Sequence, residues 1–141
     1  MMDIQLRKAT KSDWDFILEL RNNDFQYFYE QNSPIPKEAH YQYMENHVND
    51  SNFHQWIISH EGNDVGYVRI LNEDVGIMVK KEAQGKGIAS KALDLLEREA
   101  VNLGIKKLVA LIHPKNQSSE KIFKKNGYDL KLYRFEKKLT D

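Results

Sequence analysis

Residues 75–103 carry an apolar strand pattern, a glycine-rich turn and a long amphipathic helix pattern, one directly after another. The turn reads Gln84-Gly85-Lys86-Gly87, so glycines lie where the helix begins. The first amides of a helix have no partner inside the helix and lie at the positive end of its dipole, and glycine lets a ligand approach them closely. This run therefore predicts a junction that binds a phosphate or diphosphate group.

The spacing of this turn differs from two common nucleotide-binding motifs. Gln84-x-x-Gly87-x-Ala89 lacks the Gly-Lys followed by Ser or Thr of the Walker motif, and it lacks the three spaced glycines of the dinucleotide fingerprint. A module that binds ATP or GTP through Gly85-Lys86-Gly87 stays an alternative, although no Walker threonine or magnesium carboxylate is placed to help it.

The composition limits the class of protein and its partners. A chain of 141 residues suits a single domain, 1–141, with a real hydrophobic core. Lysine plus arginine equals aspartate plus glutamate at 21 each, so no bulk positive charge favours nucleic acid or an anionic membrane as a partner. The absence of cysteine excludes disulfides, thiolate metal sites and a cysteine nucleophile.

No targeting or membrane-spanning segment is expected. Residues 1–5 lack the apolar stretch of a signal peptide, and no uncharged apolar run approaches the length that crosses a bilayer. We therefore expect a soluble cytoplasmic protein that has no membrane partner.

The first half of the chain predicts antiparallel strands and two helices. Capping side chains at 10–13 precede apolar residues at helical spacing, and Pro36 suits the first turn of a second helix. The expected elements are a strand at 4–7, helices at 14–21 and 36–48, a hairpin of strands 53–59 and 65–71, and a strand at 74–80.

The second half predicts a strand-helix-strand unit. A helix at 86–103 links the strand at 74–80 to one at 107–112, and a passage of this length favours a parallel, right-handed crossover. A last helix at 117–126 leads to 128–139, where the apolar phase shift implies a bulge, a tight bend or two short strands. The sum is an α/β fold with a mixed central sheet and about four helices.

The histidines give no metal-site pattern. His40 and His47 lie seven residues apart on one predicted helix, about 10 Å along its axis, so they cannot share a metal ion. His54 and His60 flank a strand without ligand spacing. We expect no metal.

A second motif follows the strand at 107–112. It contains Asn116, Ser119, Ile122, Gly127 and Tyr128 at the spacing Asn-x-x-Ser-x-x-Ile-x-x-x-x-Gly-Tyr. Together with the glycine-rich turn, this arrangement resembles the GNAT acetyltransferases, and the resemblance spans nearly the whole chain. It implies a GNAT fold and acetyl-CoA as the cosubstrate.

The resemblance also implies which residues hold coenzyme A. The strands at 74–80 and 107–112 would splay apart around the pantetheine arm, with Lys86 and Lys91 as candidate partners for the phosphates. Asn116 could instead be a helix cap, or could serve both roles, and Gly87 and Ala89 could serve close helix packing. The implied cofactor-binding residues are Met78, Val79, Gln84, Gly85, Lys86, Gly87, Ile88, Ala89, Ser90, Asn116, Ser119 and Phe123.

The implied reaction is attack of a neutral amine on the acetyl thioester, with the backbone N–H of Met78 stabilising the oxyanion. Many family members carry a tyrosine as the acid where this chain has Phe123, which cannot donate a proton. A thiol has a pKa of about 8.5, so its anion can leave without that acid. Asp74 is the first candidate base and Glu73 the second, although Asp74 could equally be a strand-end carboxylate.

The acceptor is suggested by the segments 20–29 and 36–40. They are similar to the acceptor region of amino-sugar-nucleotide N-acetyltransferases of bacterial nonulosonic-acid pathways (pseudaminic and legionaminic type), and also to relatives that acetylate ribosomal protein N-termini. The implied acceptor-binding residues are Arg21, Asn22, Tyr27 and His40. A protein that binds acyl-CoA without turnover is a further alternative, and the oligomeric state is left open, with a homodimer as one option.

Overall fold

Four antiparallel strands form the central sheet in the order β1-β2-β3-β4. A computed structural model describes residues 3–23 and 33–140, so the predicted acceptor residue Tyr27 lies outside the described residues. The strands are β1 (Ile4–Lys8), β2 (Phe53–His60), β3 (Asn63–Leu71) and β4 (Asp74–Val79). The hairpin and the four early strands predicted from the alternating pattern are therefore confirmed.

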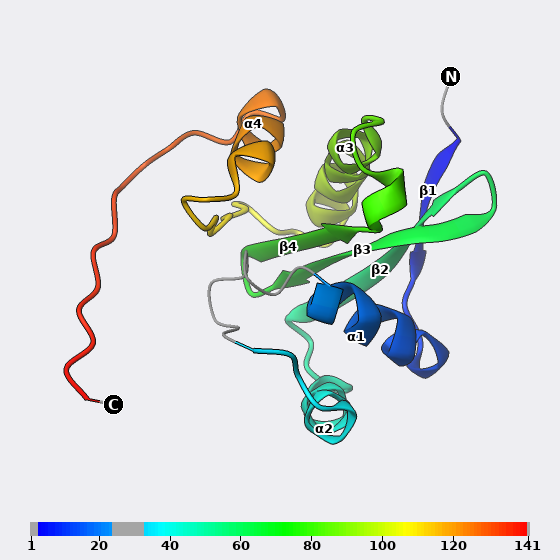
Figure 1. Cartoon of the computed structure of the whole chain (residues 1–141). Helices are drawn as coiled ribbons and strands as arrows, with labels where there is room; N and C mark the ends of the chain where they lie inside the picture. Colours follow the sequence, from blue (N-terminus) through cyan, green and yellow to red (C-terminus); the bar gives the residue numbers. More distant parts are fainter. Residues whose placement is uncertain (1–2, 24–32, 141) are drawn as a thin grey trace.

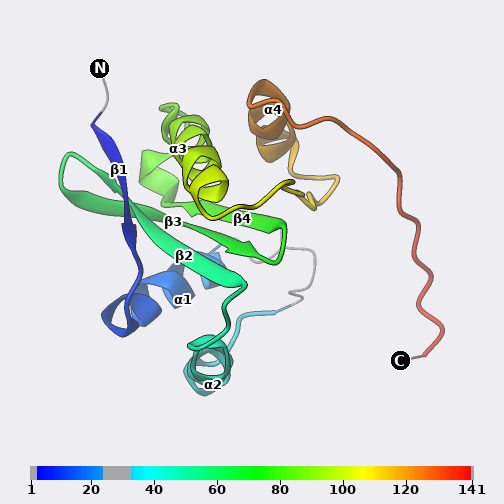
Figure 2. The same cartoon turned by 180° about the vertical axis from the view of Figure 1, so that it is seen from behind.

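Helices cover both faces of this sheet (Figures 1 and 2). On one face lie α1 (Trp14–Asn23), after a short 3₁₀ turn η1 (Lys11–Asp13), and α2 (Lys37–His47). On the other lie α3 (Ile88–Asn102), which the 3₁₀ turn η3 (Lys81–Ala83) precedes, and α4 (Gln117–Lys125). The four helices begin and end within a few residues of the predicted bounds.

Alternation along the strands builds one core on each face, because successive side chains point to opposite sides of a sheet. Trp56 and Ile58 pack toward α3, whereas Ile57 between them packs toward α1. The α3 side holds the larger cluster, which includes Val68, Ile70, Val75, Ile88, Ala92, Leu93, Leu96 and Phe123. The α1 side holds Trp14, Ile17, Leu20, Met44, Ile57 and Tyr67.

The parallel contact expected between 74–80 and 107–112 is present as a single bridge. Asp74 pairs with Val109, where the Val75 amide donates to the Val109 carbonyl and the Val109 amide donates to the Glu73 carbonyl, each at 2.8 Å. The strand predicted at 107–112 does not form, which corrects the sequence interpretation. Its apolar residues still pack against the core, but beyond Val109 its amides form no further backbone pairing with β4.

The segment after Gly127 forms neither a bulged strand nor two strands, so this prediction is wrong. It leaves α4 and extends away from the sheet (Figure 1). The apolar residues that suggested a strand are strongly exposed, with Phe135 93% and Leu139 84% exposed. Apolar alternation gives strand propensity, but a strand also needs a neighbour to pair with, and among the described residues this segment has none.

None of the helices in the described part of the chain combines the length and the apolar character that crossing a bilayer requires.

Candidate active site

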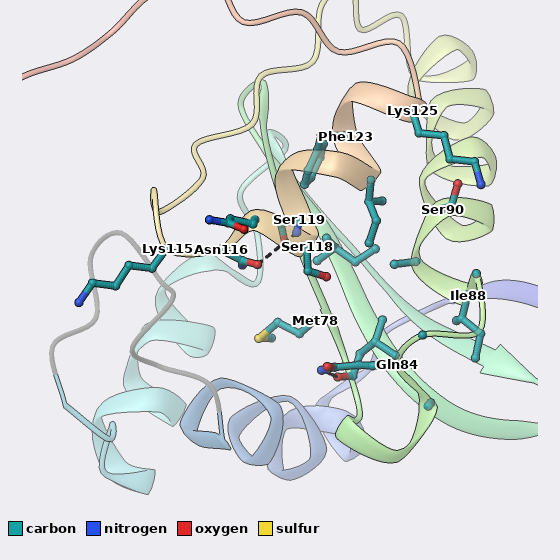
Figure 3. Close-up of a pocket in the computed structure, with 18 residues that line it drawn as sticks. Met78, Gln84, Ile88, Ser90, Lys115, Asn116, Ser118, Ser119, Phe123 and Lys125 are labelled. Atoms are coloured by element: carbon teal, nitrogen blue, oxygen red, sulfur yellow. Dashed lines mark hydrogen bonds between the residues drawn. The ribbon is translucent and has the colours of Figure 1, made fainter.

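A cavity of about 520 Å³ opens between the end of β4 and the N-termini of α3 and α4 (Figure 3). It gathers eleven of the twelve residues predicted to hold the cofactor, although their binding role itself stays a prediction. Lys86 is the exception, because it is exposed and does not line the cavity. The eleven are Met78, Val79, Gln84, Gly85, Gly87, Ile88, Ala89, Ser90, Asn116, Ser119 and Phe123.

The N-terminus of α3 presents unpartnered amides to this cavity. Gly85 and Gly87 have φ angles of 77° and 82°, which bend the chain sharply into the helix at little steric cost. No side chain caps this end, and the first turn holds no acidic residue. The amides of the first turn and the positive end of the helix dipole are therefore available to an anion.

The N-terminus of α4 lies on the same cavity and is capped by its own chain. The Asn116 side chain accepts a hydrogen bond from the Ser119 amide at 3.1 Å, which confirms the capping alternative for Asn116. Gln117 and Ser118 of the first turn also line the cavity. Two helix N-termini thus face one space from different sides.

Two lysines that sequence reasoning missed add positive charge. Lys115 directly precedes the α4 cap and Lys125 ends that helix, and both line the cavity. Figure 3 shows the Lys125 side chain reaching toward Ser90 of α3. The next residue, Asn126, donates to the Ser90 hydroxyl at 3.0 Å and so ties the end of α4 to the first turn of α3.

Other lining residues were also missed, and most of them neighbour a predicted one. For the residues on α4, the signal that could have found them is their position within one helical turn of Ser119 or Phe123, because side chains three or four apart share a helix face. They are Ile77, Ala83, Gln117, Ser118 and Ile122.

Hydrogen-bonding direction alternates along β4 and decides which amides reach the cavity edge. The Val75 amide points outward to Val109, whereas the Lys80 amide points to Val65, beside β3. Because this direction alternates residue by residue, the amides of Ile77 and Val79 point outward and that of Met78 points to β3. The oxyanion role predicted for the Met78 amide stays a prediction, and the outward direction makes the Ile77 amide a second candidate donor.

Phe123 fills the α4 wall and supplies no proton. It is 5% exposed and packs edge-to-face on Tyr128, with ring centroids 4.9 Å apart. The Tyr128 hydroxyl is buried and has no hydrogen-bond partner in 3–23 or 33–140, and burial raises its pKa to about 12. Tyr128 does not line the cavity, so it does not replace the missing acid.

Asp74, the candidate base, lies outside the cavity at the start of β4. Its Oδ2 accepts from Arg69 Nη1 at 3.2 Å, and its Oδ1 is buried with no hydrogen-bond partner among the described residues. Asp74 lies four steps along the strand from Met78, or about 13 Å. Glu73, the second candidate, faces Lys107 at 3.8 Å on the surface. Neither carboxylate touches the cavity.

The predicted acceptor residues on α1 and α2 play unequal parts. Asn22 exchanges two hydrogen bonds with the backbone of Ile35, at 3.0 and 2.8 Å, and so holds the chain that enters α2. His40 is fully buried, with Nε2 2.9 Å from the Trp14 carbonyl, and burial lowers its pKa. Arg21 lies 5.6 Å from the centre of the Tyr43 ring, and burial lowers its pKa. The geometry thus makes His40 a core residue.

Within residues 3–23 and 33–140, no three histidine, aspartate or glutamate side chains gather in a group that could hold a metal ion.

Known proteins resemble this chain in sequence and in fold. The family model described as Acetyltransferase (GNAT) domain matches residues 3–129. An uncharacterized protein of Methanocaldococcus jannaschii is 28% identical over 137 residues, which cover 89% of this chain and 28% of that protein. Spermidine N(1)-acetyltransferase of Escherichia coli K12 is 23% identical over 140 residues, covering 90% of this chain and 73% of that enzyme.

Two solved structures show the same architecture. A domain from Methanocaldococcus jannaschii has a TM-score of 0.80 at 27% identity, covering 92% of this chain and 90% of that domain. Spermidine N-acetyltransferase from Vibrio cholerae, in complex with CoA and spermine, has a TM-score of 0.78 at 20% identity, covering 88% and 79%. The chain spans less than a third of the full Methanocaldococcus jannaschii protein that it matches.

Proposed function

The chain belongs to the GNAT acetyltransferase family, and on that basis we propose that it transfers the acetyl group of acetyl-CoA to the primary amine of an amino-sugar nucleotide. The observation that carries the transferase part is the cavity at the edge of β4, where two helix N-termini and two lysines converge. The acceptor part depends on the sequence resemblance of the segments 20–29 and 36–40.

The donor set of the cavity fits the chemistry of coenzyme A. Uncapped amides at the start of α3 suit a diphosphate, and Lys115 and Lys125 suit phosphate charge. The outward amide of Val79 suits a carbonyl of an extended pantetheine arm, although the Val79 carbonyl already accepts from the Gln84 side chain at 3.0 Å. A volume of about 520 Å³ lies in the ordinary range of cofactor clefts.

When bound, acetyl-CoA supplies an activated acyl carbon. A bond forms between the amine nitrogen and that carbon, the carbon–sulfur bond breaks, and the thiolate departs. An outward amide of β4, that of Ile77, would stabilise negative charge on the acyl oxygen, and Met78 is the donor that the sequence resemblance implies. Because Phe123 offers no proton, the thiolate takes one from water, which its ordinary pKa of about 8.5 permits.

The amine must lose a proton, and Asp74 stays our candidate base through a water relay. The part of the chain that the structure describes offers no hydrogen-bond partner to its Oδ1, and Asp74 lies on the same strand as the outward amides. Asp74→Asn should lower kcat about a hundredfold, whereas Asp74→Glu should retain more of it. A loss below about threefold in kcat for Asp74→Asn would exclude this role.

The sequence resemblance of 20–29 and 36–40 to the acceptor region of amino-sugar-nucleotide N-acetyltransferases supports a nucleotide-linked amino sugar as the acceptor. Spermidine is the substrate named for the Escherichia coli relative, so polyamines are the competing class that the test must include.

The test is a thiol-release screen of the purified chain with acetyl-CoA against amino-sugar nucleotides, polyamines, amino acids and peptide N-termini. We expect turnover with the first class. A thermal-shift titration runs beside it, because a ligand at a hundred times its Kd adds about 2.7 kcal/mol of stability. Stabilisation by acetyl-CoA with no turnover on any amine would identify a binding protein, and stabilisation by ATP but not by acetyl-CoA would refute the proposal.

A further inference from the structure

Five apolar side chains that follow α4 lie in solvent. They belong to residues 129–140, which we call the C-terminal arm, and they are between 60% and 93% exposed. Scattered apolar residues are normal on a protein surface, but five within ten residues make a continuous apolar surface of the kind that marks an interaction site. The arm forms no backbone hydrogen bond with the other described residues. The five are Leu130, Leu132, Tyr133, Phe135 and Leu139.

A second set of unpaired backbone groups lies along 107–112. Side chains alternate there as in a strand, because Leu108 and Ala110 pack against the α3 core whereas Leu111 is 53% exposed. The Val109 amide and carbonyl both point to β4. Since this direction alternates along an extended chain, the backbone groups of Leu108 and Ala110 point away from β4, and they form no backbone hydrogen bond with the described residues. We call this side of 107–112 the outer edge.

The end of α4 directs the C-terminal arm away from its own sheet. Gly127 has a φ of 90°, and the Tyr128 amide donates to the Phe123 carbonyl at 3.0 Å, which closes the helix. The Tyr128 ring packs edge-to-face on Phe123 and so fixes where the arm begins.

The sequence of the C-terminal arm does not favour a return to its own sheet. Residues 130–140 contain no glycine, proline, asparagine, aspartate or serine, the types that favour a reversal of the chain. Figures 1 and 2 both show the arm running away from the sheet. The outer edge of the same copy is therefore left open, and the arm is left for another molecule.

We propose that two copies of this chain exchange their C-terminal arms, and that each arm pairs antiparallel with the outer edge of the other copy. Each copy offers one arm and one outer edge, so a two-fold axis satisfies both at once and closes the assembly as a dimer. The exchange gives 107–112 and the arm the strand neighbour that each lacks within one copy.

One register places apolar residues opposite each other on both faces. The apolar phase of the arm shifts between Leu132 and Tyr133, so the arm has apolar side chains on two faces, as 107–112 does. Directly opposite side chains in an antiparallel pair contact each other. The pairs are Leu108 with Phe135, Ala110 with Tyr133, and Leu111 with Leu132.

Charge distinguishes this register from its neighbour. It places Glu136 opposite Lys107, and a shift of two residues would place Arg134 there instead. Like charges directly opposite each other destabilise a strand pair, so the first register is favoured.

The exchange also holds one wall of the cavity. The segment 107–112 leads to Lys115 and Asn116, which line the cavity, and in one copy it is tied to the sheet by the bridge between Asp74 and Val109. Backbone pairing with the arm of the other copy adds a second attachment. The amides of Leu108 and Ala110 should then exchange slowly with deuterium in the dimer.

Sedimentation velocity of the full chain tests the dimer. The wild type should have a mass twice the 16.6 kDa of one chain. Phe135→Glu should raise the dimer Kd at least about a hundredfold, because a symmetric dimer buries this side chain twice and a charge would replace it. Phe135 is 93% exposed in one copy, so circular dichroism should show an unchanged fold.

Val101→Glu is the matched control for this substitution. Val101 is an apolar residue of α3 that is 68% exposed and lies outside both the arm and the outer edge, so the dimer Kd should stay within twofold. A wild type that remains monomeric at the highest soluble concentration would overturn the proposal. So would a dimer that Phe135→Glu and Val101→Glu affect equally.

Introduced cysteines test which copy the arm contacts, because the chain has none of its own. The double variant Leu111→Cys with Leu132→Cys uses two exposed positions. In the proposed register they form a non-hydrogen-bonded pair with Cα atoms about 4.5 Å apart, which a disulfide can span. After oxidation the double variant should run as a dimer on a denaturing gel without reductant, and each single variant should run as a monomer.

The other outcomes of this experiment overturn the exchange. Loss of both thiols in a band that runs as a monomer would place the arm on the outer edge of its own copy. Retention of free thiols would show that the arm and the outer edge do not pair. Neither test requires turnover or a bound ligand, so a failed exchange would leave the proposed transferase activity standing.

Discussion

Adding a single methyl group at Gly66 should displace the end of β4 that lines the cavity. It pairs with Val79 in the β3–β4 ladder, and a Cβ built there would lie 2.5 Å from the Met78 carbonyl oxygen. Contacts of this kind are essentially never shorter than 3.0 Å, so β4 would have to move by about 0.5 Å or more. The obstacle is backbone and cannot rotate away, as a flexible side chain could.

We expect Gly66→Ala to cost about 1–3 kcal/mol of unfolding free energy, the usual cost of overpacking a well-packed site. The movement would also displace the outward amides of Ile77 and Val79, so the KM for acetyl-CoA should rise several-fold. Urea unfolding followed by circular dichroism measures the first effect, and thiol-release kinetics measure the second.

Gly62→Ala is the matched control. Gly62 lies in the β2–β3 turn with φ 85°, and a Cβ there would meet nothing within 4 Å. Its cost, about 1–2 kcal/mol, comes from the left-handed backbone alone, and the KM for acetyl-CoA should not change. If Gly66→Ala unfolds at the wild-type urea midpoint, or if both variants shift KM equally, the steric reasoning is refuted.

Lys125→Gln should raise the KM for acetyl-CoA more than Lys86→Gln, because Lys125 lines the cavity and Lys86 does not. If thiol-release kinetics give the reverse order, the phosphates bind nearer to Lys86, outside the cavity. Asp13 is 8% exposed and paired with Arg7 at 2.8 Å, a bond that is the main cause of its lowered pKa. Its stabilising effect is present above the unfolded pKa of about 3.9 and is lost as pH falls through the folded value, so Asp13→Asn should cost about 1–3 kcal/mol at pH 7 and flatten acid unfolding below pH 4. Burial lowers the pKa of His40, so stability should decline as pH falls below about 6.5, and His40→Leu should remove that decline in a pH series of urea midpoints. Tyr128→Phe should raise stability by up to about 1 kcal/mol, because it removes a buried hydroxyl without a partner and keeps the ring contact with Phe123; a loss of stability in thermal unfolding would contradict this.

The parts of the fold that follow from local pattern were predictable from the sequence. The alternation of 53–59 and 65–71 and the apolar face of 88–102 each specify an element that buries one side, and all of them form. The cavity residues were predictable for the same reason, because the glycine turn and Asn116 mark the two helix starts that meet there.

Features that depend on how two distant segments of the chain pair with each other were not predictable. The segment 107–112 reads as a strand, but its strand character requires a β4 that runs beside it for more than one residue pair. Residue type does not say which way a strand amide points, so Ile77 as a second candidate for the oxyanion donor could come only from the pairing of the Val75 and Lys80 amides.

The single parallel bridge at Val109 is the one backbone connection between β4 and the described segment that leads to α4. The chain from 110 to 116 reaches the α4 cap without another backbone hydrogen bond to the sheet, so movement of this segment relative to β4 is the least costly way to change the width of the cavity. The amides of Val109 and Val75 report on this movement. Their hydrogen-exchange rates should fall together when a bound ligand contacts both α4 and the edge of β4.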